Sequence, residues 1–252
     1  MFIVKKPYLR DSFQQGRPVT TMLGEAIPRT LILALIAISI ALIIGIFFGI
    51  IAALRKDTWL DQAIISISIL GISLPSYVTA IIFALIFGYW LQAWTGLEMQ
   101  GGLVDLDDYG DEKIFWKNLI LPALALGVRP IAIIKQLTRA ASLDVLDQDY
   151  IRTASAKGLS FAKVIRKHLL RNALNPVFTA ASGWFASLLA GAFFVENVFG
   201  YNGLGLLTVQ ALLSYDIPVI LGAVLFTAGS FVLINIFVDL MYGFIDPRIA
   251  KQ

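Results

Sequence analysis

Long runs of apolar residues, separated by short polar segments, dominate the pattern of the chain. Crossing a hydrocarbon core of about 30 Å takes roughly 20 helical residues. The runs are continuously apolar and do not alternate, and an open strand in lipid would leave its backbone groups unpaired. We therefore predict an all-α, polytopic membrane helix bundle with five spans, at Thr30–Leu54, Ile64–Trp90, Leu119–Ile134, Val177–Val198 and Ile217–Phe244.

Composition supports a lipid environment and excludes several kinds of site. The chain is 58% hydrophobic and only 15% charged, against about 45–50% apolar and about 25% charged in soluble domains. The net charge of +3 comes from basic residues beside apolar blocks, where they set orientation, so we expect membrane lipid and no nucleic acid as a partner. The absence of cysteine and the single histidine argue against a metal site, and no cofactor is expected.

The polar segments predict the orientation, because cytoplasmic loops carry an excess of Lys and Arg. The strongly basic segment 135–175 is therefore placed inside, and the acidic segment Leu91–Lys117 outside. The same parity makes residues 1–29 an outside segment that precedes a transmembrane domain at 30–252. The basic residues of that first segment conflict with an outside location, and a further helix upstream would remove the conflict. The residues that decide the two placements are Lys135, Arg139, Arg152, Lys157, Lys163, Arg166, Lys167 and Arg171 inside and Glu98, Asp105, Asp107, Asp108, Asp111 and Glu112 outside.

Polar and helix-breaking residues within the blocks are candidates for the translocation path. Pro75 and Ser76 interrupt the second block, and Glu196 and Asn197 lie at the outer end of the fourth. The alternative for Pro75, which the residues favour over a direct substrate site, is a kink that helps helices pack. A charged residue in a span is a functional candidate, but Glu196 can equally be a rim residue that pairs with backbone or with Asn197. Arg129 either faces a cavity or extends toward the cytoplasmic headgroups, and the predicted span end at Ile134 favours the headgroups.

The basic segment 135–175 is long for a connection in a bundle, and its pattern predicts a docking element. Residues 149–159 form a short helix in this interpretation, with small residues at its centre and a terminating glycine at 158. An amphipathic stretch from Phe161 follows and is expected along the membrane surface or under the bundle. The alternative is a basic loop that only sets orientation. The candidate contact residues are Asp149, Tyr150, Arg152, Thr153, Ala154, Ala156, Lys157, Gly158 and Leu159.

Residues 149–159 resemble the EAA loop of binding-protein-dependent ABC importer permeases, with Thr153-Ala154-Ser155-Ala156 at the Glu-Ala-Ala core. The resemblance covers nearly the whole chain and is to the B-type subunits of the dipeptide/oligopeptide/nickel permease family. Members of that family usually have six spans, and this chain starts inside the outside segment that follows their first one. The matching stretches are Gly16-Arg17-Pro18-Val19, Ala52-Ala53-Leu54-Arg55, Gly71-Ile72-Ser73-Leu74-Pro75-Ser76, Leu121-Pro122-Ala123-Leu124-Ala125-Leu126-Gly127, Leu137-Thr138-Arg139-Ala140, Gln148-Asp149-Tyr150-Ile151-Arg152-Thr153-Ala154, Arg171-Asn172-Ala173-Leu174-Asn175-Pro176, Gly203-Leu204-Gly205 and Asp246-Pro247-Arg248.

This resemblance implies a type I ABC importer permease fold in the bacterial cytoplasmic (inner) membrane. It also implies a second homologous permease subunit, two ABC ATPase subunits that contact the 149–159 helix, and an extracytoplasmic solute-binding protein. Peptides are the expected cargo, with nickel or another small solute as an alternative. The chain has no phosphate-binding Gly-x-x-x-x-Gly-Lys-Ser/Thr motif, so it is not expected to be an enzyme. A secondary transporter or channel and a membrane scaffold remain alternatives, although a buried charge relay for coupling ions is missing from the sequence.

Overall fold

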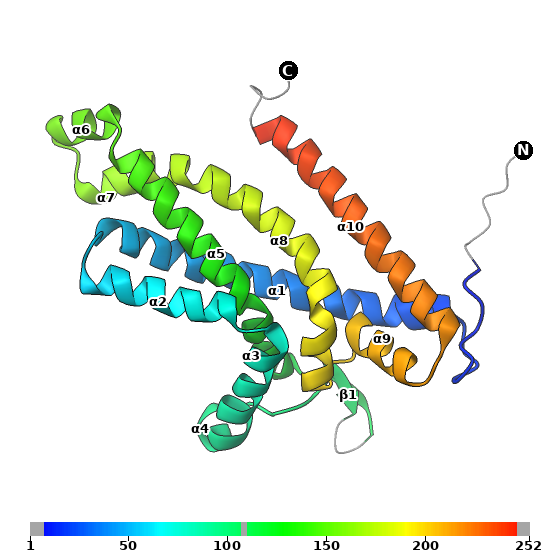
Figure 1. Ribbon diagram of the computed structural model, residues 1–252. Helices are drawn as coiled ribbons and strands as arrows, with labels where there is room; N and C mark the ends of the chain where they lie inside the picture. The colour runs from blue at the N-terminus through cyan, green and yellow to red at the C-terminus, as the bar shows by residue number, and fades with distance from the viewer. Residues whose placement is uncertain (1–7, 107–109, 246–252) are drawn as a thin grey trace, which may run out of the picture. The chain divides into compact units, whose positions relative to one another are not determined.

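The computed structural model describes residues 8–106 and 110–245. Three parts of the sequence predictions lie outside this range, namely Asp107, Asp108 and the tail residues from 246 onward. Figure 1 shows the elements in chain order: α1 (Val19–Leu54), α2 (Trp59–Ser73), α3 (Ser76–Phe83), the π-helix η1 (Ala84–Trp90), α4 (Gln92–Thr95), β1 (Val104–Leu106), β2 (Glu112–Ile114), the 3-10 helix η2 (Trp116–Leu119), α5 (Ile120–Leu146), α6 (Asp149–Ala156), α7 (Phe161–Val164), the π-helix η3 (Ile165–Leu169), α8 (Leu170–Phe199), α9 (Leu204–Leu213) and α10 (Ile217–Ile245).

The helices are long and apolar enough to give five spans, as predicted. Three qualify alone, at Val19–Leu54, Trp116–Leu146 and Ile217–Ile236, and two bent pairs bring the total to five if each pair is one span. The bounds differ from the prediction, because α1 begins at Val19 and not at Thr30. Part of the predicted outside segment is therefore helical.

The second predicted span is broken at Pro75. Leu74 caps α2 with an extended backbone (φ −79, ψ 130), which is the conformation that a following proline imposes. The chain resumes helix at Ser76, as α3. The prediction that the second block is interrupted at Pro75 is confirmed.

The connection around the predicted docking element is shorter than the sequence suggested. Helix α5 continues past the predicted end at Ile134 to Leu146. The amphipathic stretch from Phe161 runs through α7 and η3 directly into α8, so it is not a separate helix on the membrane surface. Lys, Arg and Gln are good helix formers, and charge alone does not end a helix.

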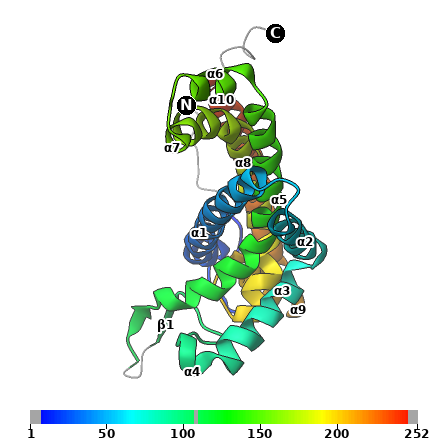
Figure 2. The same ribbon diagram turned by 90° about the vertical axis from the view of Figure 1, so that its left-hand side faces the viewer.

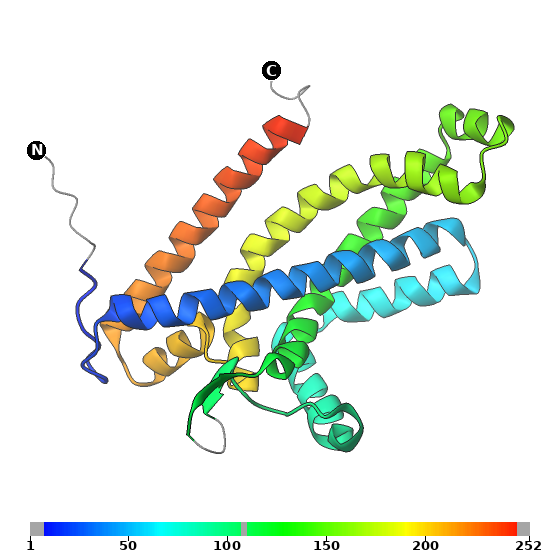
Figure 3. The ribbon, with the colours of Figure 1, turned by 180° about the vertical axis from the view of Figure 1, so that it is seen from behind.

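The chain forms two compact units, and each is described by itself. The first comprises Met1–Leu35, Ser76–Leu126 and Ala186–Ile234. Its core joins the beginning of α1 to α9 and the beginning of α10, which lie together in Figure 3. A two-stranded antiparallel hairpin, β1 with β2, also belongs to this unit and was not predicted. The buried residues of its core are Val19, Met22, Leu23, Ala26, Leu204, Ala211, Val219 and Ala223.

The second unit comprises Ile36–Pro75, Gly127–Phe185 and Asn235–Gln252. In it the later part of α1 and helix α2 run antiparallel, joined by a short turn (Figures 1 and 3). Helices α6 and α7 lie at the end of α5 and at the beginning of α8 (Figure 2). The predicted docking element therefore belongs to one compact unit with the helices that carry it.

Candidate functional site

The predicted short helix with a terminal glycine is present as α6. It spans Asp149–Ala156, and the backbone of Gly158 is left-handed, with φ +78. The N–H of Lys157 donates to the carbonyl of Thr153 at 3.0 Å, and that of Leu159 to the carbonyl of Ala154 at 3.3 Å. Glycine adopts this conformation without the strain that a Cβ brings, which explains why the helix stops there.

One face of α6 is buried within the chain. Ile151 (7% exposed), Ala154 (6%) and Val164 (3%) form a small core, against which Val145 and Leu159 pack. Ala154 and Leu159 were predicted among the residues that a partner contacts; Ala154 is buried in this core, and Leu159 is partly buried against it. The periodicity of 3.6 residues explains this, because Ile151 and Ala154 are three residues apart and share a face.

The opposite face of α6 is open to solvent. It carries the predicted residues Asp149, Tyr150, Arg152, Thr153 and Ala156, and the turn after the helix carries Lys157 and Gly158; all seven are exposed. Tyr150 is also bound within the chain, because Asn172 Nδ2 donates to its hydroxyl at 3.2 Å and its ring lies 6.2 Å from that of His168. Arg152 and Asp149 pair at 3.9 Å, but such an exposed ion pair contributes little stability.

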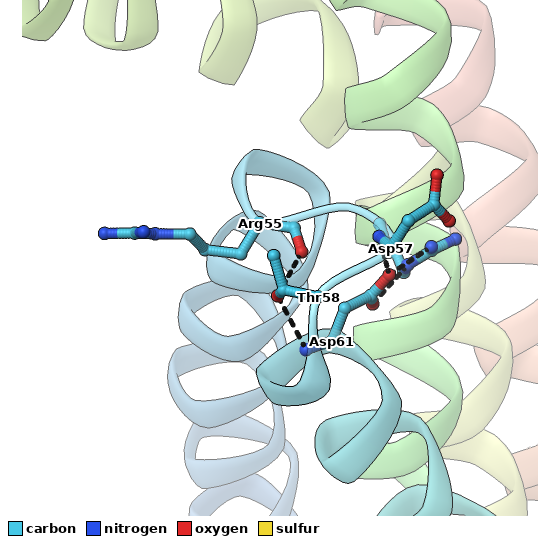
Figure 4. Close-up of polar contacts among 5 residues, drawn as sticks. Arg55, Asp57, Thr58 and Asp61 are labelled. Atoms are coloured by element: carbon cyan, nitrogen blue, oxygen red, sulfur yellow. Dashed lines mark hydrogen bonds and ion pairs between the residues drawn. The ribbon is translucent and has the colours of Figure 1, made fainter.

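A salt bridge that the sequence did not reveal fixes α5 to α2. Arg139 donates from Nε and Nη2 to the two carboxylate oxygens of Asp61, at 2.8 and 2.6 Å, and Asp61 is 1% exposed. Figure 4 shows how the turn before α2 positions this acid. The Asp57 N–H donates to Asp61 Oδ2 at 3.1 Å, and the Asp61 N–H donates to Thr58 Oγ1 at 3.4 Å. Asp61 and Arg139 are far apart in the sequence, so no local pattern pairs them.

Close helix packing also fixes α5 to α1. A Cβ on Gly49 would lie 2.5 Å from Cβ of Thr138 and 2.8 Å from the carbonyl oxygen of Lys135, and a Cβ on Gly45 would lie 2.7 Å from Cγ2 of Ile134. The glycines therefore permit backbone approach, as expected of small residues in helix interfaces. Helix α5, which leads into α6, is thus held by α1 and by α2.

Glu196 is buried and hydrogen-bonded within the chain. It is 0% exposed, and its carboxylate accepts from Thr30 Oγ1 at 2.6 Å and from the N–H groups of Gly205 and Leu206 at 2.7 and 3.2 Å. The last two are donors of the first turn of α9, where a negative charge is favourable. A Cβ on Gly203 would lie 2.4 Å from this carboxylate. The pairing with backbone, left open by the sequence, is what the structure contains.

The other translocation candidates are only partly brought together. Asn197 and Pro75 are exposed, and Ser76 is half-buried. The rings of Tyr77 and Phe194 lie 6.2 Å apart, so the beginning of α3 is adjacent to the outer end of α8. Ser76 and Asn197 belong to these neighbouring ends, whereas Glu196 points into the core.

Asp216 is a second buried acid that the sequence did not single out. It precedes α10 and is 2% exposed. The Ser12 hydroxyl and the N–H groups of Phe13 and Gln14 donate to its carboxylate, the N–H groups at 3.1 and 3.3 Å. Burial opposes the charged form, but these hydrogen bonds outweigh it and hold the pKa of Asp216 below its usual 3.8. The acid attaches the segment before α1 to the beginning of α10.

Comparisons with known proteins agree with this arrangement. A family described as binding-protein-dependent transport system inner membrane component matches residues 45–251. The dipeptide transport system permease protein DppB of Bacillus subtilis is 40% identical over 248 residues, covering 98% of this chain and 73% of the relative. The protein of the same name from Haemophilus influenzae is 38% identical over 256 residues, covering 94% of this chain and 75% of the relative.

Solved structures show the same fold. An inward-facing MetNI methionine ABC transporter has a TM-score of 0.70 at 18% identity, covering 90% of this chain and 97% of that one. An amino acid ABC transporter with histidines has a TM-score of 0.60 at 16% identity, covering 88% and 93%. The predicted importer permease fold is confirmed by these structures.

Proposed function

Since this chain belongs to the family of binding-protein-dependent transport system inner membrane components, as a permease component of an ABC importer, we propose that it carries peptides across the bacterial cytoplasmic membrane. It does so beside a second, homologous permease subunit. Two ATPase subunits on the cytoplasmic side supply the energy, and an external solute-binding protein delivers the cargo. The peptide cargo is supported by relatives of about 40% identity that are named for dipeptide transport.

The observation that carries the proposal is the structure of α6. Its inner face is fixed by Ile151, Ala154 and Val164, while the other face exposes Arg152, Thr153 and Ala156. The helix lies at the end of α5, which the Asp61–Arg139 salt bridge and the Gly49 contact hold against α2 and α1. A partner that binds the exposed face can therefore move several spanning helices together, as coupling between two states of the permease requires.

Reconstitution tests this proposal. The chain is assembled in liposomes with the second permease, the ATPases and the binding protein, and dipeptide uptake and ATP hydrolysis are measured together. We expect uptake to require ATP, and the loaded binding protein to stimulate hydrolysis. Uptake driven by an ion gradient without ATP would instead indicate a secondary transporter, and uptake of nickel but not of dipeptide would contradict the peptide cargo.

Gly158 provides the test of coupling. The space around its Cα is open, so a substitution there acts through backbone and charge and not through a clash. Gly158→Asn keeps a residue that tolerates the left-handed conformation and should retain uptake. Gly158→Asp adds a negative charge to the proposed docking face and should lower uptake about tenfold with normal membrane insertion. Equal uptake by the two variants would contradict docking at this face.

A further inference from the structure

Helix α5 differs from the other long spans in what it exposes. Its most apolar stretch is less hydrophobic than the corresponding stretches of α1 and of the described part of α10. It is nevertheless more buried within the chain: 56% of the stretch is buried, against 33% in α1 and 22% in α10. Among the described residues, the exposed faces of α1 and α10 carry large apolar side chains such as Ile43, Phe47, Leu225 and Leu233. Lipid suits those faces.

The exposed face of α5 is polar. After Ile120, the exposed positions of this helix are Arg129, Gln136, Ala140 and Asp144, and within the described residues no large apolar side chain is exposed there. The spacing of seven, four and four residues puts them on one side of the helix. The part of α8 in the same compact unit also exposes polar or small residues three or four positions apart, namely Asn172, Asn175, Thr179 and Gly183, together with the apolar Phe178. Polar faces in the membrane contact water or protein and not lipid.

The position of Arg129 along α5 indicates a depth near the middle of the predicted span. Arg139 marks the cytoplasmic level, since it pairs with Asp61 at the beginning of α2. Arg129 is ten residues earlier, or about 15 Å at 1.5 Å per residue, and about 14 Å from the other end of α5. A hydrocarbon core is about 30 Å thick. Either distance exceeds the length of an extended arginine side chain. The expectation that Arg129 extends to the headgroups depended on a span end at Ile134, and it is not supported.

Arg129 also has no hydrogen-bond or ion-pair partner among the residues that the structure describes. A guanidinium that lies at mid-membrane depth without a counterion is costly unless water or an anion solvates it. Guanidinium binds carboxylate with two parallel hydrogen bonds. Every free peptide carries one such carboxylate, and the Gln136 amide, two turns along the same face, can bond to peptide N–H and C=O groups.

We propose that the Arg129–Gln136 face of α5 lines the aqueous translocation path and that Arg129 binds the terminal carboxylate of the peptide in transit. This inference rests on the proposed function, because it takes its ligand from peptide import. It places the cargo site on the helix that leads directly into α6, so that the segment moved by the ATPase also carries the group that holds the cargo.

Cysteine labelling tests the aqueous face, because the chain has no cysteine of its own. In the complete importer in liposomes, Arg129→Cys and Gln136→Cys should react with a charged, membrane-impermeant thiol reagent. Two controls should react at least about tenfold more slowly: Ile43→Cys, which is 71% exposed on α1 and faces lipid, and Ile134→Cys, which is 0% exposed on α5. Reaction of the α5 pair as slow as the controls would overturn the proposal.

Protection by cargo tests the role of Arg129. Labelling of Gln136→Cys should be slowed by the dipeptide Ala-Ala delivered by the binding protein. Adding Arg129→Gln should raise the peptide concentration needed for protection about tenfold or more, because it removes a charge-assisted bond, while Arg129→Lys should retain part of the protection. Unchanged protection in Arg129→Gln overturns carboxylate binding. Dipeptide uptake by the unmodified importer is measured separately. If dipeptide uptake is absent while Arg129→Cys is labelled, both peptide import and the peptide ligand are wrong. The labelling would still support an aqueous face on α5.

Discussion

Glu196 accepts three hydrogen bonds in a fully buried position, and truncation would leave two buried donors and one partly buried donor without this acceptor. Each such donor costs roughly 1–3 kcal/mol. We therefore expect Glu196→Ala to lower the thermal unfolding midpoint of the detergent-solubilised permease clearly. Glu196→Gln keeps one acceptor oxygen for the α9 donors, and its effect should be less than half as large.

The same pair of variants separates a structural role from a role in the path. If Glu196 only holds α9 against α8, uptake per assembled importer stays normal in Glu196→Gln, and the loss in Glu196→Ala follows the loss of folded protein. Normal unfolding midpoints combined with a specific loss of uptake in both variants would instead return Glu196 to the translocation path.

Asp216 predicts a dependence of stability on pH. Its pKa is lowered in the folded protein from the usual 3.8, so its contribution is complete above about pH 5 and is lost as the pH falls through the folded value. Asp216→Asn should lower the stability by about 1–3 kcal/mol at pH 7. The difference between the natural protein and the variant should shrink below about pH 4. Unfolding midpoints between pH 7 and pH 3 measure this, with the exposed Asp147→Asn as a control; a constant difference would contradict the prediction.

At the scale of the helices, two glycines of α1 give a matched test of packing. A Cβ on Gly49 would lie 2.5 Å from the Thr138 side chain and 2.8 Å from the Lys135 backbone, whereas a Cβ on Gly24 meets nothing within 4 Å. Gly49→Ala should therefore destabilise the permease by about 1–3 kcal/mol, since the α5 backbone cannot move away cheaply. Gly24→Ala should be neutral or stabilise by up to about 1 kcal/mol, through helix propensity. Similar unfolding midpoints for the two variants would show that α1 and α5 are not held at this contact.

The sequence predicted the existence of the helices better than their ends. Apolar runs identify spans because lipid leaves few alternatives to helix, and Pro75 marked the break in the second span. The run says nothing about where a helix stops, since the polar residues after Ile134 continue α5 to Leu146. The antiparallel pairing of β1 with β2 was missed because three-residue strands have too little periodicity to detect.

The features of the candidate site that depend on neighbouring residues in the sequence could be predicted. The terminal glycine of α6 is a local signal, and it was found at Gly158. The face of α6 that packs inward depends on Val164, which belongs to the next helix, so the sequence of α6 alone did not show that Ala154 is buried. Asp61 and Arg139 are 78 positions apart, and Ser12 and Asp216 are 204 positions apart. Patterns in a single sequence relate only nearby residues, so neither pair could be predicted.

For the whole importer, the two faces of α6 predict different defects for two neighbouring alanines. Ala156 is exposed, so Ala156→Trp should leave the permease folded and reduce binding of the ATPases. Ala154 is 6% exposed and packs with Ile151 and Val164, so Ala154→Trp should displace α6 from the chain itself, because overpacking forces the backbone to shift. Both variants should lose ATP-driven uptake, but for different reasons.

Limited proteolysis and ATPase co-purification distinguish the two defects. We expect Ala156→Trp to resist cleavage between α5 and α8 as the natural protein does, yet to retain ATPase subunits at least about fivefold less well. Ala154→Trp should be cleaved faster at the same place before any ATPase is added. If Ala156→Trp co-purified normally with the ATPases and supported full uptake, the exposed face of α6 would not be the docking surface, since a tryptophan on this face cannot be accommodated in a close contact without rearrangement.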